Sequence, residues 1–262
     1  MKSVIFFDID GTLVSEDGLM TIPESTRTAI SLARKNGCVT FINTGRTAFN
    51  VNKNVRSLGF DGIICGCGTY IEYNGDILLY NRLEQDFCRE TARLMRKCGV
   101  TPVYEHKDGY FFDNLAPVNA QLEDFLKNFV ESGIDISRRV EDENFMFDKF
   151  VVWKNENCNF ELFLRETGKN FDIIDRGHGF YENVPKGFSK ATAINLILEK
   201  LDIPLENAYA IGDSANDLPM LTAVPNSIAM GGAESIYPYV SYITAPLHED
   251  GIYNALRHFN LI

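Results

Sequence analysis

The alternation of short apolar runs with amphipathic segments is the feature of this chain that most constrains its fold. Apolar runs at 4–7, 39–43 and 62–65 have the length of buried strands, and helical patterns at 23–36 and 47–58 separate them. Strands and helices that alternate in this way form βαβ units, whose strands lie parallel in one sheet. This opening segment therefore predicts an α/β fold with a doubly wound, Rossmann-like parallel sheet.

The same alternation of strand and helix patterns occurs again in the last third of the chain. Apolar residues between 194 and 201 follow the i, i+3, i+4, i+7 spacing of a helix. Strand patterns at 208–211 and 228–230 come next, with a helical pattern at 218–223 between them. Because both ends of the chain have the same βαβ pattern, we expect them to belong to one core domain.

The middle of the chain has a different pattern of residues. It contains aromatic-rich strand candidates together with helical patterns at 85–98 and 116–132, without the regular alternation of the flanks. We interpret it as an inserted α+β domain. The predicted organisation is a discontinuous core domain of residues 1–82 and 183–262, with the inserted domain at 83–182.

Composition limits the classes of protein to which the chain can belong. Its 262 residues and 45% hydrophobic content suffice for two packed cores. A net charge of -11 opposes binding to the phosphate backbone, so we expect no nucleic-acid partner. The apolar run at 4–7 is too short for a signal-peptide core, and no apolar run approaches the ~18 residues of a membrane span. We expect a soluble cytoplasmic protein without membrane contact, and no obligate protein partner is evident.

The pentapeptide Asp8-Ile9-Asp10-Gly11-Thr12 places two carboxylates and a glycine turn directly after the first predicted strand. In open α/β sheets the ligand crevice lies at the carboxyl ends of the strands. Two carboxylates there favour Mg²⁺, which proteins hold with carboxylates and substrate phosphate oxygens. Because an aspartate with a pKa of about 3.9 is ionised at neutral pH, Asp8 is the candidate nucleophile towards phosphorus, and Asp10 the candidate acid and base. The alternative interpretation is an Asx-Gly turn that only ends a strand.

A second polar motif, Asn43-Thr44-Gly45-Arg46-Thr47, begins at the end of the predicted strand at 39–43. A threonine hydroxyl, a glycine amide and a helix N-terminus together form an anion cradle, so Thr44 and Gly45 are candidate phosphate ligands. Arg46 is expected to pair either with phosphate or with acidic neighbours, and the sequence does not decide between the two. Thr-Gly also ends strands that have no catalytic function.

A third candidate is Lys190, at the start of the helix that contains residues 194–201. Ser189 is a plausible N-cap, which would place Lys190 in the first turn, where a cation opposes the helix dipole. Such a placement suggests that the ammonium faces an anion. Lys186 is the competing candidate, and a solvated surface lysine is the ordinary interpretation of both.

The fourth motif, residues 212–217, follows the strand predicted at 208–211 and contains three polar candidates. Asp213 would provide another oxygen ligand for Mg²⁺. Asp217 would either bind the metal or orient Lys190, and Asn216 would orient the loop or contact the substrate. Each motif alone has a structural explanation, but all four lie at a strand end or a helix start. One shared site explains this better than four unrelated turns.

These four motifs resemble those of the haloacid dehalogenase-like hydrolases, and Glu249-Asp250-Gly251-Ile252 is similar to the Cof-like sugar-phosphatase branch. The resemblance implies a core with an inserted α+β cap domain of type IIB that closes over the crevice. It implies Asp8 as nucleophile, Asp10 as acid and base, and Thr44 and Lys190 as phosphate ligands. It also implies Mg²⁺ held by Asp8, the Asp10 carbonyl and Asp213.

We therefore predict a Mg²⁺-dependent phosphatase that acts on a small phosphorylated metabolite such as a sugar phosphate, through an aspartyl phosphate. A phosphotransferase or phosphomutase with the same intermediate is the nearest alternative. A phospho-accepting signalling module is disfavoured because such a module needs only one small domain. A non-catalytic phosphometabolite-binding protein is disfavoured because both Asp8 and Asp10 are present. Polar residues of the inserted segment such as Glu105 and Arg176 are interpreted as structural or solvated.

Overall fold

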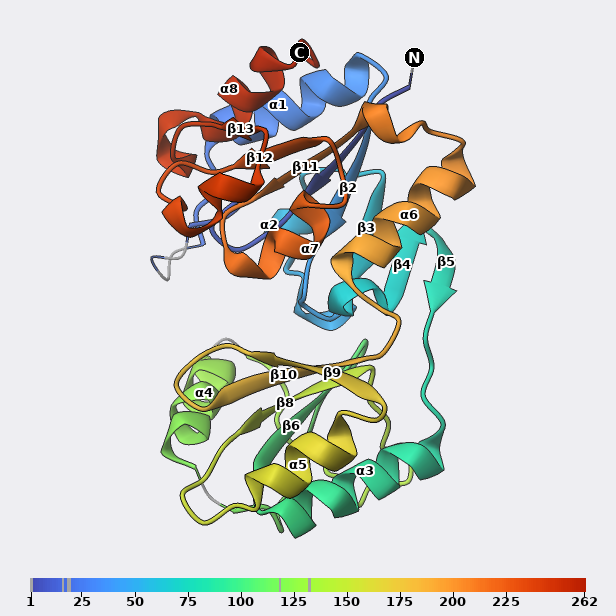
Figure 1. The fold of residues 1–262 in the computed structure, drawn as a ribbon, viewed down its shortest axis with the longest axis vertical. Coiled ribbons are helices and arrows are strands. Elements are labelled where there is room, and N and C mark those ends of the chain that lie inside the picture. Colours follow the sequence, from blue (N-terminus) through green and yellow to red (C-terminus); the bar gives the residue numbers. More distant parts are fainter. Residues whose placement is uncertain (1, 16, 18–19, 118, 132) are drawn as a thin grey trace. The chain divides into compact units, whose positions relative to one another are not determined.

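The computed structural model describes residues 2–15, 17, 20–117, 119–131 and 133–262. Its contacts group the chain into two compact units (Figure 1). The core unit comprises Met1–Arg46, Val51–Tyr80 and Phe188–Ile262, and the inserted unit comprises Thr47–Asn50 and Asn81–Gly187. Because contacts alone do not test independent folding, the domain boundaries given above stay a prediction.

The core unit contains a sheet in the order β13-β12-β11-β1-β2-β3-β4-β5. The strands from β13 to β3 pair in parallel, and β4 and β5 add an antiparallel hairpin at one edge. The predicted doubly wound α/β fold is confirmed. The strand bounds are β1 Val4–Phe7, β2 Val39–Asn43, β3 Gly62–Cys65, β4 Tyr70–Tyr73, β5 Asp76–Tyr80, β11 Ala208–Gly212, β12 Asn226–Ala229 and β13 Tyr242–Ile243.

Helices cover both faces of this sheet, with α1 and α8 together on one face and α6 and α7 on the other (Figure 1). On the second face, Val4 and Phe6 of β1 pack in one apolar cluster with Ile194 of α6 and Met220 of α7. Burial on both faces explains why β1 is a continuous apolar run. The helix bounds are α1 Glu24–Lys35, α2 Lys53–Arg56, α6 Lys190–Leu201, α7 Leu218–Leu221 and α8 Gly251–His258.

The inserted unit is an antiparallel sheet in the order β7-β6-β8-β10-β9 with helices on both faces. An aromatic cluster joins one sheet face to α3 and α5, and a second cluster joins the other face to α4. The bounds are α3 Gln85–Cys98, β6 Thr101–His106, β7 Gly109–Phe112, α4 Ala120–Glu131, β8 Lys149–Trp153, α5 Phe160–Thr167, β9 Phe171–Asp175 and β10 Phe180–Pro185.

Two predicted helices differ from the structure. The segment 47–58 is not one helix but a 3₁₀ turn, η1 (Ala48–Asn50), followed by the single-turn α2. Asn52 separates the two, because its extended backbone and its side chain, which accepts a hydrogen bond from the Val55 amide at 2.9 Å, start a new helix there. The pattern at 116–132 corresponds to the shorter α4, and positions 118 and 132 lie outside the described residues.

Candidate active site

Asp8 and Asp213 meet at one edge of the core sheet because they follow neighbouring parallel strands. Phe7 at the end of β1 pairs with Ile211 of β11, and the Asp8 amide donates to the Ile211 carbonyl at 3.0 Å. Gly11 makes the approach possible. A Cβ atom there would lie 2.2 Å from Asp213 Oδ2, and its φ of +73° is one that side chains rarely adopt.

Lys190 is the first residue of α6, and its ammonium lies between two carboxylates. Its Nζ is 2.6 Å from Asp8 Oδ1 and 2.5 Å from Asp217 Oδ1, and the residue is only 5% exposed. Ser189 caps the helix as predicted and forms a capping box with Thr192. Lys186, the competing candidate, is an exposed residue of the inserted unit.

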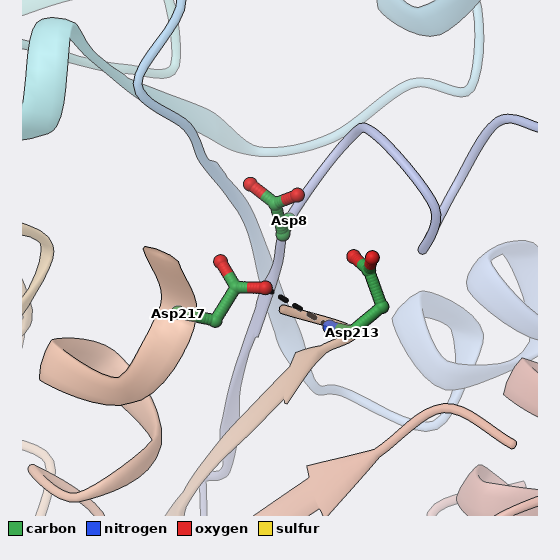
Figure 2. A group of neighbouring side chains, drawn as sticks. All are labelled: Asp8, Asp213 and Asp217. Atoms are coloured by element: carbon green, nitrogen blue, oxygen red, sulfur yellow. Dashed lines mark hydrogen bonds between the residues drawn. The ribbon is translucent and has the colours of Figure 1, made fainter. Parts of the chain in front are cut away.

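Asp217 is fully buried and its two oxygens are both engaged by protein donors. Oδ1 accepts from Lys190, while Oδ2 accepts from the amides of Asp213 and Ser214 at 2.9 and 3.2 Å (Figure 2). Gly212 leaves room for this carboxylate, since a Cβ there would lie 2.6 Å from it. Asp217 therefore ties the loop after β11 to the amine of Lys190.

The site combines charges that perturb each other strongly. Burial, followed by the negative charge of Asp217, raises the pKa of Asp8 to about 8 despite the nearby Lys190. Without a cation in the site, burial thus shifts the pKa of Asp8 upward from the ordinary value used in the sequence analysis. Burial alone would lower the pKa of Lys190, but the charges of Asp8 and Asp217 outweigh it and hold this pKa above its ordinary value. Lys190 is a permanent cation here.

The donor set fits a hard divalent cation. Oxygens of Asp8, Asp213 and Asp217 lie within 4.8 Å of one another (Figure 2), and one ammonium balances only one of these three carboxylates. When all three carboxylates are ionised, two negative charges remain beyond Lys190, which is the charge that Mg²⁺ would neutralise, and carboxylate oxygens are its preferred protein ligands. Thr12, which ends the first motif but had no role assigned from the sequence, orients Asp213 by donating to its Oδ1 at 2.9 Å.

The second motif lies on a tight loop rather than at a helix N-terminus. The amides of Gly66 and Cys67 donate to the carbonyls of Arg46 and Thr44 at 2.8 and 3.1 Å, which fixes the loop against the 3₁₀ turn η2 (Gly66–Gly68). The Thr44 hydroxyl accepts from the Arg46 amide at 3.2 Å and is buried. An anion cradle at Thr44 and Gly45 would therefore depend on a hydroxyl and loop amides, without a helix dipole.

Arg46 pairs with an acidic neighbour, the choice that the sequence left open. Its Nε donates to Asp10 Oδ2 at 2.9 Å, and its Nη2 donates to Asp10 Oδ1. This bidentate geometry fixes the plane of the Asp10 carboxylate. Asn216, by contrast, is exposed on the 3₁₀ turn η4 (Ala215–Asp217).

Polar residues of the inserted unit form a separate buried network. Lys149 Nζ pairs with Glu182 and lies 3.4 Å from Glu105 Oε2, while Arg176 donates to Glu182 through Nε at 3.0 Å. The apolar run of β8 after Lys149 predicts a strand but does not indicate which charged partner Lys149 has, so sequence reasoning missed this network.

Comparison with known proteins identifies the class that this fold and site define. The model of the haloacid dehalogenase-like hydrolase family matches residues 5–256, so the chain belongs to this family. The predicted Cof-like branch and the prediction of an enzyme of the hydrolase class are confirmed. Among the described residues, no helix has both the length and the apolar character needed to cross a bilayer.

Individual relatives align over nearly the whole chain. YkrA of Bacillus subtilis, which is named as a phosphatase, is 29% identical over 100% of this chain and 99% of its own length. YcsE of the same organism, a 5-amino-6-(5-phospho-D-ribitylamino)uracil phosphatase, is 26% identical over 98% of this chain and 96% of its own. The structure of BT4131, a sugar phosphatase of subclass IIB, has a TM-score of 0.80 and 29% identity over 99% of this chain and 100% of that one.

Proposed function

We propose that the chain is a Mg²⁺-dependent phosphatase that hydrolyses a small phosphorylated metabolite, a sugar phosphate, through an aspartyl phosphate on Asp8. The observation that carries the proposal is the position of Lys190, whose buried ammonium is shared between Asp8 and Asp217 beside the carboxylate of Asp213. A nucleophilic carboxylate that faces a phosphate needs such a fixed positive charge. The names of YcsE and BT4131 support a phosphorylated sugar or polyol as substrate.

The residues act in two steps. An oxygen of Asp8 forms a bond to phosphorus while the bond from phosphorus to the leaving oxygen breaks, and Asp10 protonates that oxygen. Asp10 then takes a proton from the water that attacks the phosphorus of the aspartyl phosphate, which frees Asp8 and phosphate. Thr44, Gly45 and Lys190 hold the phosphoryl oxygens during both steps.

The cation would be held by Asp8, Asp213 and the Asp10 carbonyl, and Asp217 would orient Lys190 because its own oxygens are already engaged. Mg²⁺ supplies the charge neutralisation that lets one anion approach another. Arg46 orients Asp10, and Asn216 lies at the exposed end of the loop where it would reach the substrate.

Release of phosphate from a panel of phosphorylated sugars, nucleotides and cofactors tests the proposal. We expect turnover with Mg²⁺, its loss with a chelator, and a decrease of at least about 1,000-fold in Asp8→Asn. Asp76→Asn, an exposed change on β5, is the control and should leave turnover intact. Stoichiometric formation of an isomeric sugar phosphate without free phosphate would favour a phosphomutase instead, and full activity of Asp8→Asn would exclude the proposed intermediate.

A further inference from the structure

Asn43 is a buried polar residue next to the site, and the second motif, which begins with it, assigns it no role. It is the last residue of β2 and is 0% exposed. Its side-chain Nδ2 donates to the main-chain carbonyl of Lys190 at 3.0 Å, across 147 positions of the sequence. Asn43 therefore connects the strand end that precedes Thr44 to the first turn of α6.

This contact acts on the part of α6 that decides where the Lys190 amine lies. The capping box of Ser189 and Thr192 sets the helix start but lies within the helix itself. Gly68 contacts the same turn from η2, since a Cβ there would lie 2.7 Å from the Ser189 carbonyl. Asn43 provides a directional bond from the core sheet, and the main chain of Lys190 is thereby fixed relative to Asp8.

The side-chain amide of Asn43 stabilises the fold less than an apolar side chain of similar size would. Its Oδ1 is buried and has no hydrogen-bond donor among the protein atoms of the described residues. A buried acceptor without a donor destabilises the folded state, and an apolar side chain of similar size would avoid this. Residues that lower stability in this way are expected where activity needs them.

We propose that Asn43 is a positioning residue, which holds the first turn of α6 so that the Lys190 ammonium stays between Asp8 and Asp217 and meets the phosphoryl group. The inference rests on the proposed function. Asn43 does not touch substrate in this scheme. It sets the position of the charge that does, so its loss lowers the rate of phosphoryl transfer more than it weakens substrate binding.

The test compares Asn43→Leu with Asn183→Leu. Asn183 is a matched control because it is also 0% exposed, donates to main-chain carbonyls and has an Oδ1 without a donor, but it lies in β10 of the inserted unit. We expect Asn43→Leu to keep or raise the denaturation midpoint and to lower kcat about tenfold, the effect of one lost hydrogen bond, with KM changed less than about twofold. Asn183→Leu should leave kcat unchanged.

Amide hydrogen exchange provides a readout that does not depend on turnover. We expect faster exchange over residues 191–194 in Asn43→Leu, and also in Asn43→Ala should the leucine variant fold poorly, with no such change in Asn183→Leu. Unchanged kcat together with unchanged exchange would overturn the inference, as would a lower denaturation midpoint with full kcat. If the wild-type protein releases no phosphate from any substrate, the proposed function fails, whereas the exchange result still decides whether Asn43 holds the helix turn.

Discussion

The pairing of Arg46 with Asp10 shows how one side chain can fix the orientation of another. The guanidinium presents two parallel donors to the carboxylate, and its side chain is only 18% exposed while that of Asp10 is 43% exposed. A planar fork of this kind fixes orientation as well as charge, which a lysine cannot do. Asp10 is therefore held in place but stays accessible, as the proposed mechanism requires of its general acid.

Replacement of Arg46 by alanine should separate this role from phosphate binding. A sugar alkoxide needs a proton to leave, whereas 4-nitrophenolate does not. We expect Arg46→Ala to lower turnover of a sugar phosphate by about 100-fold, because a misplaced general acid loses most of its effect. The pre-steady-state burst of nitrophenolate from 4-nitrophenyl phosphate should change less than about threefold. Equal losses for both substrates with a raised KM would instead make Arg46 a phosphate ligand.

At the scale of the elements, local sequence patterns predict the strand bounds and caps that depend on neighbouring residues alone. The bounds of β1, β2 and β3 agree with the predicted strands, since a strand buried on both faces is a continuous apolar run. The N-cap at Ser189 was also predictable, because capping depends on the residue type at the helix start. The interrupted segment 47–58 was not, because the backbone of Asn52 leaves the helical region where the apolar pattern continues.

The candidate site was predictable to a similar extent. Each motif residue lies at a strand end or helix start, so the sequence indicates that Asp8, Thr44, Lys190 and Asp213 belong together. The specific contacts could not be predicted, because they join positions that are remote in the chain through side-chain geometry. The bonds from Arg46 to Asp10 and from Asn43 to Lys190 are of this kind. Polar residues at strand ends indicate that a site exists, but which side chains pair with each other depends on the folded structure.

The aromatic cluster between the sheet of the inserted unit and α3 contains a tyrosine whose hydroxyl is buried without a partner. Tyr104 of β6 is 0% exposed and packs against Phe145, Phe147 and Phe150, with ring centroids 5.1 to 5.9 Å away. Its hydroxyl has no hydrogen bond within the described part of the chain. The ring stabilises the cluster, whereas the hydroxyl loses its hydration without compensation.

We therefore expect Tyr104→Phe to stabilise the inserted unit by about 1 kcal/mol, since it removes a buried unsatisfied group and keeps the ring. Equilibrium urea denaturation, followed by fluorescence, measures the effect as a rise of the midpoint. Phe150→Ala is the opposing control, because it leaves a cavity in the same cluster and should cost roughly 3–5 kcal/mol. A lower midpoint in Tyr104→Phe would show that the hydroxyl makes a stabilising bond.

At the scale of the whole molecule, acid stability depends on carboxylates that are ionised in the folded chain. The chain carries a net charge of -11, and most of its acids lie at the surface, where pairing contributes little. Glu182 is different. Burial opposes its ionisation, but the charges of Lys149 and Arg176 outweigh burial and hold its pKa at about 2, below the ordinary value of 4.5. Its partner Lys149 is itself buried, and Lys149 also lies 3.4 Å from the buried Glu105.

The sign of the resulting pH dependence follows from these values. A carboxylate whose pKa is lowered in the folded state contributes its full stability above pH 4.5 and loses it as the pH falls towards 2, because the unfolded chain binds the proton first. Glu182→Gln should lower the stability at pH 7 by roughly 3 kcal/mol, since it leaves the buried Lys149 with Glu105 alone and removes the carboxylate that pairs with Arg176. It should also flatten the fall in the urea midpoint below pH 4.5. Asp124→Asn removes an exposed partner of Lys127 and should leave the midpoint nearly unchanged at every pH. Parallel pH profiles for wild type and Glu182→Gln would mean that other carboxylates govern acid unfolding.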